Sequence, residues 1–393
     1  MSQYSLRNVF RRLDRTLLIQ YLEKRPAAQH VVAALQSVDL PAAFAHLDEL
    51  PDFDRTELEA DLRYVHDLST EQGLLCINHE IASRRRLGLA VSLPSEFDAL
   101  EGFEDRVLCA VMNDPHLVAT ASLYLHADSL SERSWRRFDE IPQRPDLHLT
   151  DQMGSQIAEG IRGIYSADGR ARRVTAERYI RNGQHYVFVF ADDYRSIRIE
   201  HADDDSLQRR PSRPTFEIVF VYDASAGTLD VFARGDRKVK NNIARLFVDI
   251  VFGPDIALAP RKPTYNVDLL RHRATALPVD RNDGVSMARV RRLRLCVSRD
   301  RTQRITFEVP TIGREKDIYD LMDEHLDHPA SDARYEVSQA EVQFFMLPEA
   351  GHRGAKPYSF TVTAPDHCSL RNLPEAIQAV AHKYLRAWGV SGS

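Results

Sequence analysis

Apolar residues in the first 150 positions recur at intervals of three and four, the spacing of amphipathic helices. The longest stripe runs from Leu6 to Leu22 and predicts one continuous helix. Asp54 and Glu57 have the spacing of a capping box in front of another helix. The same periodicity predicts further helices over residues 27–37, 54–69, 71–86, 101–113 and 115–127. We therefore predict an N-terminal helical domain over residues 1–149.

After residue 150 one more helix is expected over 151–164, and then the apolar period shortens to that of strands. Tyr186 to Phe190 is apolar on both faces, which predicts a central strand. Residues 216–222 predict a second strand, residues 223–228 a turn, and residues 229–233 the returning strand. A helix is expected to follow Asp236 and to end at Gly253.

The remaining chain predicts a second unit in the order β-β-α-β-β-α. Its expected elements are strands at 287–298 and 303–310, a helix at 317–326, strands at 334–346 and 357–363, and a helix from Pro374 to Gly389. The predicted fold class is α+β: an N-terminal helical domain followed by mainly antiparallel sheet units with helices packed on one face. The predicted domains are 1–149, 150–258 and 259–393, and the last two are either separate or continuous.

Composition excludes several classes of protein. Of 393 residues, 43% are apolar and 28% are charged, which predicts a packed core and argues against wholesale disorder. The four cysteines are far apart in sequence, so we expect reduced thiols in a cytoplasmic protein. Neither a signal peptide nor a transmembrane segment is expected, and so no membrane partner. Lysines make up only seven of the 52 basic residues, a bias that suits a GC-rich bacterial genome.

Sequence motifs of the common enzymes are absent. The chain contains no phosphate-binding loop, no dinucleotide-binding glycine motif, no zinc-protease motif and no nucleophile elbow. We expect no cofactor and no metal. The best catalytic candidates are Asp223, Asp236 and Lys238, whose pattern resembles that of metal-dependent nucleases, with two carboxylates for Mg²⁺ and a lysine for the attacking water. Turn and helix-cap roles already account for both carboxylates and argue against the nuclease interpretation.

Charge is distributed unevenly along the chain. Residues 1–150 carry a net charge of −8, residues 151–300 of +6, and residues 301–393 of −3. The basic middle contains the candidate binding residues Arg195, Arg198, Arg234, Arg237, Lys238, Lys240, Arg292 and Arg294. Cations next to a helix start oppose the helix dipole, so those near Asp236 are easier to explain if an anion meets them.

Our leading hypothesis is therefore a non-enzymatic binding or assembly protein whose basic α+β face contacts nucleic acid or an acidic protein partner. A role in a bacterial accessory or defence system fits a chain so poor in motifs. The first alternative is a metal-dependent nuclease that uses Asp223, Asp236 and Lys238. The second is an oligomeric scaffold or sensor, a homo-oligomer without nucleic acid. The sequence favours a protein that is not an enzyme.

Overall fold

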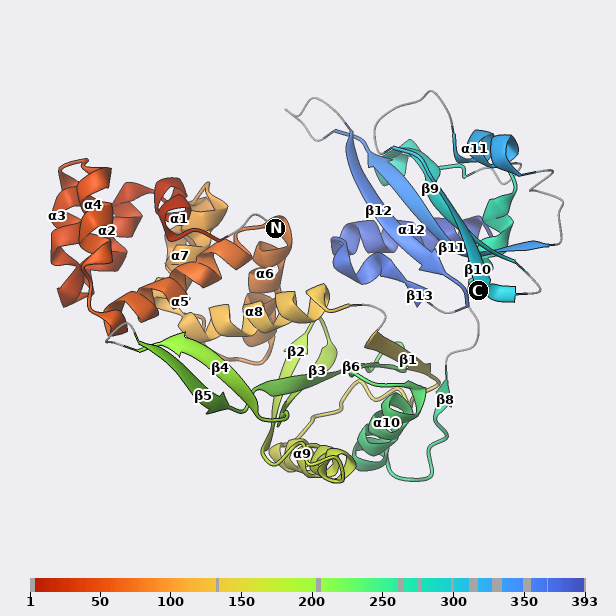
Figure 1. Ribbon diagram of the computed structural model, residues 1–393, viewed down its shortest axis with the longest axis horizontal. Coiled ribbons are helices and arrows are strands. Elements are labelled where there is room, and N and C mark those ends of the chain that lie inside the picture. Colours follow the sequence, from red (N-terminus) through yellow and green to blue (C-terminus); the bar gives the residue numbers. More distant parts are fainter. Residues whose placement is uncertain are drawn as a thin grey trace. The chain divides into compact units, whose positions relative to one another are not determined.

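The computed structural model describes residues 4–131, 134–202, 206–260, 265–273, 277–297, 300–310, 317–326, 334–348, 355–365 and 367–391. The fold is α+β, with helices in the N-terminal part and antiparallel sheets later in the chain (Figure 1). Two compact units form, each from two segments: Met1–Leu130 with Gln143–Ala226 (unit 1), and Ser131–Pro142 with Gly227–Ser393 (unit 2). The predicted three-domain division stays a prediction.

Unit 1 begins with a series of helices that bury their apolar stripes against one another. They are α1 (Leu6–Arg12), α2 (Arg15–Glu23), α3 (Gln29–Gln36), α4 (Leu40–Asp48), α5 (Asp52–Leu68), α6 (Glu71–Arg86), α7 (Phe103–Asn113) and α8 (Pro115–Ser129). The predicted single helix from Leu6 to Leu22 is wrong, because Asp14 interrupts it. The Asp14 carboxylate accepts a hydrogen bond from the Leu17 backbone N–H at 3.0 Å and starts a second helix.

Two further predictions about these helices need correction. Asp54 and Glu57 form no capping box, because α5 starts two residues earlier and places Asp54 in its first turn, after Pro51 as N-cap. Helix α4, capped by Asp39, was not expected. The other helices of this region lie close to their predicted positions, as strong apolar periodicity leads one to expect.

The strands of unit 1 fall into two groups. β2 (Val174–Arg181), β3 (Gln184–Asp192) and β6 (Thr215–Asp223) are antiparallel, with β3 in the middle and buried on both faces, as predicted. Helix α9 (Asp151–Ser166) packs against β2 and β3. β4 (Ser196–His201) and β5 (Leu207–Ser212) pair only with each other. We call this pair the ribbon; the apolar pattern did not predict it.

The N-terminal part of unit 2 joins distant segments. β1 (Trp135–Asp139) pairs antiparallel with β7 (Thr228–Phe232) on one side and with β8 (Ala259–Pro260) on the other. Helix α10 (Arg237–Phe252) packs against β7 and ends at Gly253, whose φ of 99° lies in the region that glycine favours. The strand at 229–233 and this helix lie where they were predicted.

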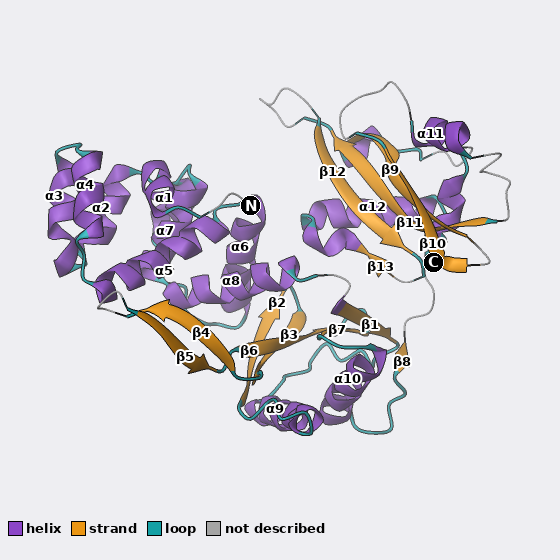
Figure 2. Ribbon diagram, in the orientation of Figure 1, coloured by secondary structure: helices purple, strands orange, loops and turns teal. Residues whose placement is uncertain are grey.

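A five-stranded antiparallel sheet forms the rest of unit 2, in the order β10-β9-β11-β12-β13 (Figure 2). Its elements are β9 (Val285–Val297), β10 (Asp300–Glu308), α11 (Ile318–His325), β11 (Tyr335–Met346), β12 (Lys356–Thr363), β13 (His367–Cys368) and α12 (Glu375–Ala387). Its described elements follow the order β-β-α-β-β-α, with the unpredicted two-residue strand β13 added before α12. Residues 298 and 299, between the first two strands, lie outside the described residues. Leu293, Leu295 and Phe344 share one buried core with Met322 of α11 and Tyr384 of α12.

In the described part of the chain, none of the helices combines the length and the apolar character needed to cross a lipid bilayer.

Candidate functional site

Several arginines of the basic middle form ion pairs within unit 1. Arg181 at the end of β2 is only 6% exposed, and its guanidinium donates two hydrogen bonds of 2.8 Å to Asp128 of α8. Arg170 donates to Asp193 at 2.9 Å and lies 4.1 Å from the ring centre of Phe216. A bidentate, buried pair such as Arg181 with Asp128 orients two elements and offers no charge to a ligand.

A second polar group lies beside this pair, between α6, α8 and β2. Glu80 is 7% exposed and accepts hydrogen bonds from Arg84 at 2.7 Å and from the Tyr124 hydroxyl at 3.1 Å. Arg84 also donates to Asp114, the N-cap of α8, at 3.1 Å. Burial, reinforced by Asp128, raises the pKa of the nearby Cys76 thiol to about 12 even though Arg181 opposes the shift, so this cysteine is not an activated nucleophile. The members of this group bind one another, which is typical of a structural network.

A cavity of about 230 Å³ opens next to this network. Its lining residues include Glu80, Arg84, His148, Arg178 and His185. The Arg178 side chain is already held by the Leu149 carbonyl and the Asp151 carboxylate. Burial, and then the proximity of His148, lower the pKa of His185, so its imidazole is neutral near pH 7. The arginines that line the cavity are therefore already hydrogen-bonded, and the His185 ring carries no charge.

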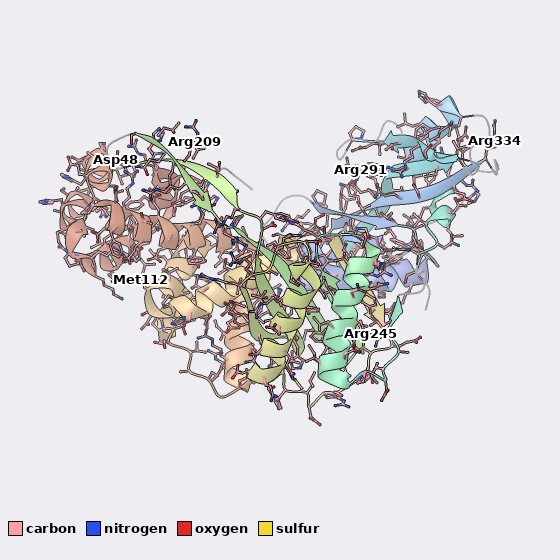
Figure 3. All side chains as sticks on the ribbon, turned by 60° about the horizontal axis from the view of Figure 1, so that its bottom comes forward. Asp48, Met112, Arg209, Arg245, Arg291 and Arg334 are labelled. Carbon is pink, nitrogen blue, oxygen red and sulfur yellow. The ribbon has the colours of Figure 1, made fainter. Side chains whose placement is uncertain are left out.

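The predicted pair Arg292 and Arg294 lies on the polar face of the five-stranded sheet, opposite the face on which Leu293 and Leu295 are buried. Arg292 is bound by two carboxylates, with Glu341 at 2.7 Å and Glu308 at 3.8 Å. A register shift in β9 places Arg291 beside it, and Arg291 (Figure 3) binds the same two carboxylates at 2.6 and 2.8 Å. Arg294 is half-buried opposite Gln339. This face consists largely of internal ion pairs.

The three nuclease candidates have local roles in the structure. Asp223 accepts hydrogen bonds from the backbone N–H groups of Ser225 and Ala226, both at 2.9 Å, which closes the turn after β6. Burial opposes its ionisation, yet these bonds and one from Gln184 hold the pKa of Asp223 below its usual range. Asp236 is the N-cap of α10 and accepts from the Val239 N–H at 2.9 Å. Lys238 is exposed in the first turn.

Metal-binding clusters are absent from the residues that the structure describes. No group of three or more His, Cys, Asp and Glu side chains there is arranged to hold a metal ion. The nuclease hypothesis stays a prediction.

Exposed cations gather at the start of α10. Arg234 and Arg237 are exposed, as is Lys238, and within the described residues the side chains of all three form no ion pair. Lys240 differs from them, because it is only 8% exposed and faces the interior. Burial, and then the charge of Arg136, lower the pKa of Lys240. The predicted group of four is therefore three surface cations and one buried lysine.

The predicted pair Arg195 and Arg198 lies at the ribbon. Both side chains are exposed. Arg198 lies directly opposite Arg210 of β5, and Arg210 contacts Glu200 at 3.3 Å. The acidic residues 203–205, which the sequence places between the two strands, lie outside the described residues.

Sequence reasoning missed the polar network around Glu80 and Arg181. A signal was present: Glu80 follows the buried Cys76 and Ile77 by four and three residues, so it falls on the apolar side of α6. Arg84 then follows Glu80 by four residues, the spacing of a helical ion pair. A charged pair that falls on the apolar side of a helix indicates a buried network, whereas a charged pair on the polar side indicates a solvated face.

Comparison with known proteins leaves the chain without a family. None of the protein-family models matches it, and a search of curated proteins returned no match either.

Proposed function

We propose that this protein is a binding protein that contacts nucleic acid through the cations at the start of α10. The observation that carries the proposal is the exposure of Arg234, Arg237 and Lys238 within five consecutive positions, without an acidic partner in the described part of the chain. Four other arginines of the basic middle, Arg170, Arg181, Arg291 and Arg292, are instead paired with Asp193, Asp128, Glu308 or Glu341.

The three cations and the N-terminus of α10 carry charge of the same sign, which only the capping carboxylate of Asp236 opposes. The N-terminus of an α-helix carries about half a positive charge from its aligned peptides. Three cations placed there repel that charge, at a cost of about 0.3–1 kcal/mol for each charge in the first turn. An anion bound at the same place is attracted both by the helix N-terminus and by the three cations, and so offsets their mutual repulsion. The arrangement is unfavourable in the unbound protein and favourable with a phosphate present.

The composition of the patch favours nucleic acid over an acidic protein. Residues 234–238 are Arg, Gly, Asp, Arg and Lys, all exposed, and contain no apolar or aromatic side chain. Protein interfaces are centred on desolvated apolar and aromatic residues. Phosphate backbones are recognised mainly by charge, which this patch supplies.

The test measures binding of single- and double-stranded DNA and RNA oligonucleotides by fluorescence anisotropy over a series of salt concentrations. The variant R234E/R237E/K238E is expected to bind more weakly. For double-stranded DNA its dependence of log K on log salt should flatten by about 0.9 for each phosphate that the variant no longer neutralises.

The matched control is R15E/R85E/R86E, which changes the net charge equally at three exposed arginines of the helical region. It should leave the salt dependence unchanged. Equal weakening by both triple variants overturns the proposal, because bulk charge then accounts for binding. Absence of binding by the unmodified protein overturns it too, and an acidic protein partner becomes the better hypothesis.

A further inference from the structure

The ribbon of unit 1 is largely exposed and carries large apolar side chains. Ile197, Ile199 and Leu207 are 68%, 60% and 52% exposed. Residues of β4 and β5 pair in an unbroken ladder from Ser196↔Ser212 to His201↔Leu207 (Figures 1 and 3, with Arg209 labelled in Figure 3). A two-stranded ribbon is marginally stable in water on its own, and three or more strands are usually needed. The ribbon is therefore short of a partner strand.

The two edges of the ribbon are not equivalent. β5 contains Pro211, which has no backbone N–H and is typical of an edge strand that stays unpaired. β4 has the sequence Ser-Ile-Arg-Ile-Glu-His, without proline or lysine. No described strand other than β5 pairs with it. β4 thus presents an unpaired edge without the proline or lysine that often protect edge strands against strand addition.

The sequence of β4 is complementary to itself in one antiparallel register. If Ile199 lies opposite Ile199 of a second copy, each Arg198 lies opposite a Glu200. Each Ile197 then lies opposite a His201. Opposite-charge pairs at directly facing positions stabilise a sheet.

Neighbouring registers are worse. Centring the pair on Arg198 or on Glu200 places like charges face to face, which is destabilising. A shift by a single residue in the pairing places the isoleucine face of one strand on the charged face of the other. Of these registers, only the one centred on Ile199 keeps the two strand faces separate and places acid beside base.

We propose that β4 pairs antiparallel with β4 of a second copy of this chain, in the register centred on Ile199. The product is a four-stranded sheet, β5-β4-β4-β5, with two Arg198–Glu200 pairs on one face. On the other face the four isoleucines form a continuous row. Since a six-residue strand pair is small beside a standard interface of about 1,600 Å², this dimer dissociates on dilution.

Sedimentation velocity of the full-length chain over a concentration series tests the proposal, and circular dichroism verifies that each variant is folded. The unmodified chain is expected to show a monomer–dimer equilibrium. R198E and E200R should each remain monomeric, because both place like charges opposite one another twice. An equimolar mixture of R198E and E200R should dimerise again, because acid then faces base at both positions.

A matched control is Arg209→Glu on β5, which lies outside the paired edge and should leave dimerisation intact. Oxidative cross-linking gives an independent measurement. Ile199→Cys should form a disulfide dimer, since facing Cβ atoms are about 4.5–5.5 Å apart. Ile197→Cys should not form one, because in this register position 197 of one copy lies opposite position 201 of the other, four residues away from the second cysteine.

Some results would overturn the proposal. They are a chain that is monomeric at every concentration, a mixture of R198E and E200R that fails to associate, and equal cross-linking by the two cysteine variants. Dimerisation that persists in both charge variants would show that another surface forms the dimer. The result does not depend on nucleic acid, so it separates this proposal from the binding function of α10.

Discussion

Arg181 and Arg237 show how differently one residue type is used in the two units of this protein. Arg181 is 6% exposed and donates two hydrogen bonds to Asp128, so its charge is neutralised where it lies. Arg237 is exposed at the positive end of α10 and, among the described residues, forms no ion pair. Burial makes the first charge dependent on its partner, whereas solvent makes the second nearly independent of its neighbours. A net charge alone does not distinguish these roles.

The largest expected effect concerns the buried arginine. Asp128→Ala leaves the Arg181 guanidinium desolvated and unpaired, so we expect a loss of about 3–5 kcal/mol of unfolding free energy. Chemical denaturation monitored by circular dichroism measures it. The double variant Asp128→Leu/Arg181→Met removes both charges and should be closer to the unmodified protein than Asp128→Ala alone. A loss below about 1 kcal/mol in Asp128→Ala would contradict the view that this charge depends on its partner.

Two histidines extend the comparison, because their pKa values are shifted in opposite directions. A hydrogen bond to Glu217 at 2.7 Å, reinforced by the charge of that carboxylate, raises the pKa of His126 although burial opposes the shift. Its stabilising effect is therefore complete below the unfolded-state pKa of about 6.5 and is lost as pH rises through the higher folded-state value. His126→Gln should cost about 0.2–1 kcal/mol at low pH and nothing at high pH.

His185 should behave in the opposite way. Burial, reinforced by His148, lowers the pKa of His185, so the unfolded chain takes up its proton first as pH falls below about 6.5. His185→Phe preserves a ring against Tyr222, on which His185 stacks. Its stability relative to the unmodified protein should therefore rise as pH falls from about 7 to about 5. The unfolding free energies of both variants, measured relative to the unmodified protein across this pH range, test these two opposite dependences on pH. The same pH dependence in both variants would contradict the opposite pKa shifts of the two histidines.

A small effect is expected at the exposed arginine. Arg237→Glu removes a cation that opposes the dipole of α10 and introduces an anion that favours it, so we expect a gain of about 0.3–1 kcal/mol that salt screens. Thermal unfolding at low and high salt measures it. Asp236→Ala, which removes the cap of the same helix, should instead cost about 0.5–2 kcal/mol. Destabilisation by Arg237→Glu would mean that Arg237 has a structural partner after all.

The apolar pattern predicted most helices and strands because burying a stripe or an alternating face is a local requirement. It failed where a single side chain changed the local outcome. Asp14 divides the expected N-terminal helix, since a carboxylate that can accept from the Leu17 N–H competes with helix continuation. The alternation Ile197-Arg198-Ile199-Glu200 was present in the sequence, yet a strand that no core covers leaves a weaker signal than Tyr186 to Phe190.

The candidate site also divides into a part that the sequence predicts and a part that only the fold decides. The chain alone shows that basic residues concentrate in its middle, and that Asp223 and Asp236 suit a turn and a cap, because turn and cap chemistry involves neighbours in sequence. Which arginines are neutralised depends on pairs such as Arg181 with Asp128, 53 residues apart. Likewise, Lys240 is buried because the apolar face of α10 packs inward and carries its first turn with it. Ion pairing between distant residues depends on which surfaces the fold brings together, and no local pattern encodes that.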